Sequence, residues 1–231
     1  MRLGVAQIHS MVSVEDAIAV AALDADHVSM MVSKRAIPYT VDIDLGGRIC
    51  SSRMGQSICV ALPIFYDPME ILDLALRDIT QIASYEEHLP RDRYMEVFSV
   101  LGIHGIKVFK PIPAGLGRNF EASIFCSKYS DYMLLETCEE PPSPLLIGFI
   151  GGAGSIRVLS TSGEIAMSIA KPTILAGGLN PDNAATENII VRPQVVDAAT
   201  SLDIAGSKSR KDLSSNRSFM KNVRGGFNEI L

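Results

Sequence analysis

The stretch that decides the fold is Pro172-Thr173-Ile174-Leu175-Ala176-Gly177-Gly178-Leu179-Asn180-Pro181-Asp182-Asn183. Its apolar run predicts a buried strand and its glycine pair a tight turn. Asn180 before Pro181 predicts a helix start, with Asn180 at the N-cap. Such a turn can bring backbone N–H groups and the positive end of a helix dipole to an anion, most often a phosphate. Because glycine pairs are also common in turns that bind nothing, an anion site and a plain tight turn both stay open.

The rest of the chain repeats this alternation of apolar runs with helical patterns. Such alternation implies parallel strands joined by right-handed crossovers. Eight units in 231 residues fit a closed (β/α)8 barrel, or TIM barrel, better than an open doubly wound sheet. With no low-complexity linker between them, residues 1–231 are expected to form one α/β domain. The strand candidates are 3–8, 27–32, 58–65, 78–83, 106–112, 132–137, 172–176 and 194–199.

The helix candidates vary in how clearly they are marked. Ser13 is expected to cap a helix over residues 14–21, and Asp67-Pro68 starts another. Residues 33–57 fit a β-hairpin or a long loop as well as a helix. Further helices are expected at 91–101, 120–127, 163–170, 181–188 and 209–223.

Composition limits the class of protein. Hydrophobic residues make up 47% of the chain and charged residues 20%, which is typical of a folded protein with a sizeable core. A net charge of −5 gives no electrostatic reason to expect a nucleic acid or an anionic membrane as partner. The four cysteines show no CxxC spacing, so reduced thiols and a cytoplasmic location are expected. No histidine spacing suggests a metal site, and no cofactor is implied.

Three motifs in the second half resemble one enzyme family. Residues 174–183 are close to its strand-seven signature, Gly151-Gly152-Ala153-Gly154 resembles its GGTG loop, and residues 196–203 resemble its VDVSSGVE segment. Weaker similarities follow in the same order upstream, at 14–17, 25–26, 33–35, 60–72 and 81–82. The chain therefore resembles phosphoribosylanthranilate isomerases, the (β/α)8 enzymes of tryptophan biosynthesis.

The resemblance implies an Amadori rearrangement of a phosphoribosyl amine, an aldose–ketose isomerisation. In the family a cysteine ending strand one takes the C2′ proton, and an aspartate ending strand six protonates the ribose ring oxygen. Aligning the family's KICGIT with residues 4–9 puts Ala6 at the cysteine position. The family's LLD(T/S) aligns with residues 134–137 and puts Glu136 at the acid. His9 is a candidate replacement base, because an imidazole titrates near neutrality.

Binding residues are carried over in the same way. Gly177 and Gly178, with Thr200 and Ser201, are expected to cradle the substrate phosphate, because barrels of this kind often bind phosphate after strands seven and eight. Arg35 stands where the family arginine holds the anthranilate part. The remaining substrate-binding candidate, on strand five, is Lys110.

Each candidate also has a plain structural explanation. Glu136 could be a structural carboxylate paired with Lys110, and His9 a solvated loop histidine. Arg35 could be a surface arginine. The first hypothesis is an isomerase acting on a phosphorylated small molecule, as a monomer or homodimer. The alternatives are a non-catalytic relative that binds a phosphorylated ligand or a partner, motivated by Ala6, and a different phosphosugar enzyme on the same barrel.

Overall fold

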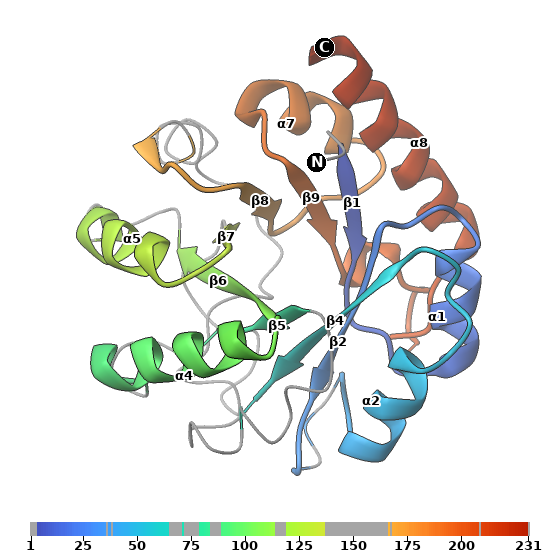
Figure 1. Ribbon diagram of the computed structural model, residues 1–231. Helices are drawn as coiled ribbons and strands as arrows, with labels where there is room; N and C mark the ends of the chain where they lie inside the picture. Colours follow the sequence, from blue (N-terminus) through green and yellow to red (C-terminus); the bar gives the residue numbers. More distant parts are fainter. Residues whose placement is uncertain are drawn as a thin grey trace.

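The computed structural model describes residues 4–35, 37, 39–64, 71, 79–83, 89–113, 119–136, 166, 168–207 and 209–230. Its strands surround a central axis and its helices lie outside them (Figure 1). The strands are β1 (Val5–Ile8), β2 (His27–Val32), β3 (Thr40–Val41), β4 (Ile58–Pro63), β5 (Ile79–Gln81), β6 (Lys107–Pro113), β7 (Tyr132–Glu136), β8 (Thr173–Ala176) and β9 (Val195–Ala198). The helices are α1 (Val14–Ala21), α2 (Ile43–Cys50), α4 (Arg91–Ile103), α5 (Asn119–Lys128), α7 (Ala184–Val191), α8 (Leu213–Ile230) and the 3₁₀ turn η2 (Thr200–Leu202).

Eight of the strands close into a parallel barrel. Around the ring they follow the order β1-β9-β8-β7-β6-β5-β4-β2, and β2 pairs with β1 to complete it. The two-residue β3 adds to the far end of β2, where Met31 pairs with Thr40. Every strand candidate from the sequence corresponds to one barrel strand, and the predicted (β/α)8 barrel is confirmed.

Alternation along the strands separates two apolar layers. The layer inside the barrel contains Phe109 and Leu134, both almost fully buried. On β1, Ala6 and Ile8 belong instead to the layer between the strands and the helices, so Val5, Gln7 and His9 face the barrel interior. This assignment of faces decides which side chains can reach the site. The remaining interior residues of the inner layer are Val60, Ile79, Ile174, Ala176 and Val195.

The helix predictions hold in position more often than in their bounds. The Ser13 hydroxyl accepts the backbone N–H of Asp16 at 3.1 Å, which confirms the predicted cap of α1. Residues 33–57, left open between hairpin, loop and helix, contain both β3 and α2. Asp212 accepts the N–H of Ser214 at 2.8 Å, so α8 begins later than predicted and continues to Ile230.

The helix after the glycine pair starts later than predicted. The Asn180 side chain accepts the N–H groups of Asp182 and Asn183 at 2.8 and 3.2 Å. It therefore caps a turn, and α7 begins only at Ala184. The predicted helix started by Asp67-Pro68 lies largely outside the described residues, and half of the one at 163–170 does. The glycine cluster at 151–154 lies entirely outside them.

The prediction of reduced cysteines is wrong for two of the four. Cys50, the last residue of α2, forms a disulfide with Cys59 near the start of β4, with their Cα atoms 5.4 Å apart. The chain turns back from the helix end to the strand start within nine residues, and this brings the two thiols together without any CxxC spacing. Cys126 is buried and is not part of this disulfide. None of the helices within the described part of the chain is long and apolar enough to cross a membrane.

Candidate active site

The predicted site residues converge at one end of the barrel because its strands are parallel. His9 directly follows β1, Glu136 is the last residue of β7, and Gly177 directly follows β8. Thr200 and Ser201 form the turn after β9. These positions are the carboxyl ends of the strands, where barrels of this kind carry their chemistry.

The turn after β8 has a left-handed backbone at two glycines and is fixed by two hydrogen bonds from side chains. Gly177 and Gly178 have φ angles of +88° and +65°, a left-handed conformation that favours residues without Cβ. The Asn183 side-chain amide donates to the Gly178 carbonyl at 3.1 Å, and the Ser201 hydroxyl donates to the Leu179 carbonyl. The turns after β8 and β9 are therefore joined, and they form one rim on which an anion can meet backbone N–H groups and hydroxyls.

Glu136 lies at the same end of the barrel, one strand away from this rim. It pairs in register with Pro113 on β6 and Ala176 on β8, and its side chain is 6% exposed. Leu134, two residues earlier, belongs to the interior layer, so Glu136 also faces inward. A buried carboxyl group at this end of a barrel is in position to exchange a proton with a bound substrate.

The alignment that placed Ala6 at the family's cysteine is wrong in register. Ala6 is fully buried against the helix layer and cannot line the mouth. The inward-facing residue at the end of β1 is His9, whose Nδ1 lies 3.1 Å from the Ser10 hydroxyl. Burial, and to a lesser degree the Lys211 ammonium, lower the pKa of His9 to about 3. The imidazole is therefore neutral at pH 7, the form that can accept a proton.

Two further ionisable residues at this end were missed from the sequence. Asp197 on β9 faces inward, because Val196 and Ala198 belong to the helix-facing layer. Burial raises the pKa of its carboxyl to about 7, although interactions with Gln7 and Lys211 oppose part of the rise. A charged residue within the apolar run Val195–Ala198 was the available signal.

Lys211 is buried beside the loop after β9. Its Nζ donates to Asp203 Oδ1 at 2.6 Å and to the Ala199 carbonyl at 3.2 Å. Burial lowers the pKa of Lys211, and the Asp203 carboxylate opposes that change. The Lys211 ammonium group thus lies next to the rim formed by the two turns, because it is hydrogen-bonded to the carbonyl of Ala199, the residue before Thr200.

The two remaining binding candidates are placed differently. Lys110 is on the same face of β6 as Val108 and Ile112, which pack in the helix-facing layer. Its Nζ is 5.8 Å from the centre of the Tyr94 ring on α4. The expected contact of Lys110 with substrate is therefore corrected: strand parity directs its side chain away from the barrel interior. Arg35 is exposed in the loop after β2, where its backbone N–H is bonded to the Ser33 hydroxyl at 3.1 Å.

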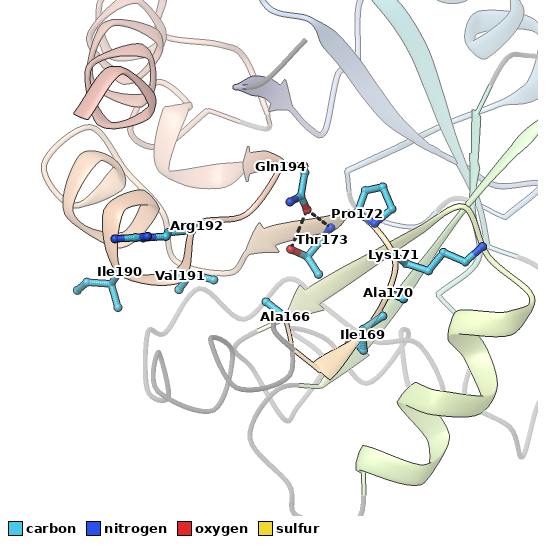
Figure 2. Close-up of a pocket in the computed structure, with 10 residues that line it drawn as sticks. All are labelled: Ala166, Ile169, Ala170, Lys171, Pro172, Thr173, Ile190, Val191, Arg192 and Gln194. Carbon is cyan, nitrogen blue, oxygen red and sulfur yellow. Dashed lines mark hydrogen bonds between the residues drawn. The ribbon is translucent and has the colours of Figure 1, made fainter. Parts of the chain in front are cut away.

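A cavity of about 490 Å³ lies at the opposite end of the barrel (Figure 2). Thr173, the first residue of β8, lines it together with Gln194, which directly precedes β9. The Gln194 side-chain oxygen accepts the N–H of Thr173 at 2.6 Å and its hydroxyl at 3.2 Å. The cavity is thus separated from the mouth by the length of the strands, and its central polar groups bond to each other (Figure 2).

The structure is a (β/α)8 barrel with buried carboxyl groups and a buried imidazole at the carboxyl ends of its strands, beside the two joined turns after β8 and β9. The N-(5'-phosphoribosyl)anthranilate isomerase of Methanocella arvoryzae is 30% identical over 212 residues, which are 91% of this chain and 93% of that protein. The solved phosphoribosyl anthranilate isomerase of Thermotoga maritima superposes with a TM-score of 0.78 at 22% identity, covering 96% of this chain and 98% of that one. A solved phosphoribosyl anthranilate isomerase in complex with reduced 1-(o-carboxyphenylamino)-1-deoxyribulose 5-phosphate superposes with a TM-score of 0.75 at 20% identity, with 96% and 98% covered.

No protein-family profile matches the chain. The identity to the Methanocella protein nevertheless extends over nearly the full length of both proteins. The chain belongs to the N-(5'-phosphoribosyl)anthranilate isomerase family.

Proposed function

We propose that the protein is an active isomerase that converts N-(5'-phosphoribosyl)anthranilate into 1-(o-carboxyphenylamino)-1-deoxyribulose 5-phosphate in tryptophan biosynthesis, with residues 1–231 acting as one barrel domain. The observation that carries the proposal is the placement of Glu136 and His9 at the same end of the barrel, on strands that are not neighbours. An acid and a base on different sides of a bound sugar are what this rearrangement requires.

Glu136 serves as the acid in this proposal. It donates its proton to the ribose ring oxygen as the bond between that oxygen and C1′ breaks, and the nitrogen lone pair forms an iminium with C1′. His9 then removes the proton from C2′, and the electron pair of that bond forms the enolamine, which becomes the ketose product. Neutral His9 is competent for this step because its burial keeps the resting imidazole unprotonated.

The phosphate and the anthranilate part of the substrate are bound on different sides of the mouth. The backbone of Gly177, Gly178 and Ser201, with the Thr200 hydroxyl, holds the phosphate, since both turns meet at the rim after β8 and β9, where the Ser201 hydroxyl donates to the Leu179 carbonyl. Arg35, in the loop after β2, pairs with the anthranilate carboxylate through its planar fork.

Turnover of freshly generated phosphoribosylanthranilate, followed by loss of its fluorescence, tests the activity. The wild type should turn over, and Glu136→Gln should lose on the order of 100-fold or more in kcat because the proton donor is removed. Folding of the variant is checked by its circular dichroism spectrum. A folded wild type with no turnover would refute the proposal and favour the non-catalytic relative. Binding of other phosphosugars without turnover would favour a different enzyme on the same barrel.

The cytoplasm is the proposed location, in keeping with a biosynthetic role. Either a monomer or a homodimer is compatible with a site built from one chain, and light scattering distinguishes them. Because cytoplasmic proteins seldom keep disulfides, thiol counting on freshly purified protein tests the pairing of Cys50 with Cys59.

A further inference from the structure

Several buried polar atoms without a hydrogen-bond partner lie in the barrel interior. Among the described residues, Asp197 Oδ1 and His9 Nε2 have no partner, and the same holds for Ser29 Oγ on β2 and Gln81 Oε1 on β5. All four side chains face the interior by strand alternation. Because burying an unpaired polar group destabilises a fold, such a group is expected where it has a function.

Asp197 and His9 are diagonal neighbours across β9 and β1. Asp197 pairs in register with Gln7, two residues before His9, and the His9 backbone N–H donates to the Ala198 carbonyl at 2.8 Å. Diagonal neighbours on one face of a sheet lie about 7–8 Å apart, which is near enough for the carboxylate to act on the imidazole electrostatically. The Asp197 carboxyl therefore lies one step deeper in the barrel than the His9 imidazole, on the same side of the mouth.

The groups that face this pair are few. The Lys211 ammonium acts on both residues, and its own nearest anion is Asp203 at 2.6 Å. Beside Asp197, its register partner Gln7 interacts with the carboxyl, and Gln7 Oε1 lies 3.2 Å from Nδ1 of His27 on β2. On β8, the register of Leu175 with Val196, continued by one residue, places the apolar Ala176 opposite Asp197, and Glu136 on β7 pairs with Ala176 from the other side. Asp197 is thus the buried carboxyl group diagonally adjacent to His9 on the neighbouring strand, within the described interior.

We propose that Asp197 is a positioning residue that acts through His9, its carboxylate stabilising the imidazolium formed when His9 accepts the substrate proton. The proposal rests on the proposed function. In the step concerned, the bond between C2′ and its hydrogen breaks and the proton passes to the imidazole. The electron pair of that bond forms the C1′=C2′ bond, while the π pair of the iminium returns to nitrogen. The buried Lys211 ammonium disfavours a second cation beside it, and the Asp197 anion offsets that repulsion.

The kinetic test compares Asp197→Asn with a matched control. Glu187→Gln removes another buried carboxyl group with an unpartnered oxygen, but on α7 outside the barrel. Asp197→Asn should lower kcat on the order of 100-fold with little change in KM, while Glu187→Gln keeps wild-type kinetics. Because burial raises the pKa of Asp197 to about 7, wild-type kcat/KM should rise with pH through that region, and Asp197→Asn should lose this rise.

A second measurement needs no turnover. The imidazole nitrogens of His9, assigned through a His9→Gln variant in ¹⁵N-histidine-labelled protein, should respond to an ionisation near pH 7 in the wild type and in Glu187→Gln. The response should be absent in Asp197→Asn.

The outcomes separate the two proposals. A wild type without turnover refutes the proposed function and, with it, the catalytic role of Asp197. Turnover by the wild type with unchanged kcat and pH profile in Asp197→Asn overturns the role of Asp197 alone. An equal loss in Glu187→Gln also overturns it, because general destabilisation would then explain both variants.

Discussion

The buried carboxyl of Asp197 should make the free energy of unfolding depend on pH in a way that Asp197→Asn removes. In the unfolded chain this group ionises near its ordinary value of 3.8, whereas burial raises its pKa in the folded protein to about 7. Between these values the folded state binds more protons than the unfolded state, so the contribution of Asp197 to stability falls as pH rises. Above pH 7 the full penalty is present. A difference of this size corresponds to at most about 4 kcal/mol.

The variant should therefore gain stability relative to the wild type, by up to about 4 kcal/mol, as the pH is raised from 4 to 8. The comparison at each pH is essential because burial lowers the pKa of His9 to about 3 and of His27 to about 4. Those two groups make stability rise with pH below about 6.5 and would mask the effect of Asp197 in the wild type alone.

Urea unfolding at pH 4, 5, 6, 7 and 8 measures this difference. The chain contains no tryptophan, so the helical circular dichroism signal is followed in place of indole fluorescence. A constant offset between the two proteins would be the cost of the amide itself and is compatible with the reasoning. A difference in unfolding free energy that stays flat from pH 4 to 8 would refute the buried, protonated carboxyl, and so would one that changes in the opposite direction.

Two further predictions concern stability, each with its own comparison. A Cβ at Gly226 would lie 3.0 Å from the Ala185 carbonyl oxygen, so Gly226→Ala should destabilise the protein by about 1–3 kcal/mol. A Cβ at Gly225 would meet nothing within 4 Å, so Gly225→Ala should stabilise the protein by about 0.5–1 kcal/mol. Equal urea midpoints for the two variants would contradict the close packing of α7 on α8. Replacing both Cys50 and Cys59 by serine should cost about 2–3 kcal/mol by opening the short loop, and a reducing agent should lower the midpoint of the wild type but not of the double variant.

The barrel was predictable because its signals are local. Apolar runs alternating with helical spacing marked all eight barrel strands, and parallel pairing followed from that alternation. The predicted helix bounds were less accurate where a side chain accepts backbone N–H groups and stabilises a turn before the helix. Asn180 accepts two backbone N–H groups of a turn, and this delays α7 to Ala184, which composition alone does not reveal.

The site was predictable only in part, because strand faces reverse with a shift of one residue. Ala6 was placed at the base position, but it packs against the helices, and His9 faces the mouth. Lys110 was placed at the substrate, but its parity with Val108 and Ile112 directs it to the helix layer. The disulfide escaped prediction because it depends on where α2 ends relative to β4.

The sequence by itself determined the barrel, the glycine turn after β8 and the resemblance to one family, since periodicity, turn residues and motifs are properties of neighbouring residues. The tertiary structure decided which side chains meet. It joined the Ser201 turn to Leu179, buried Lys211 beside the rim and made Asp197 a diagonal neighbour of His9. Burial then shifts the pKa values of Lys211, Asp197 and His9, because desolvation depends on everything packed around a side chain and not on its neighbours in the chain.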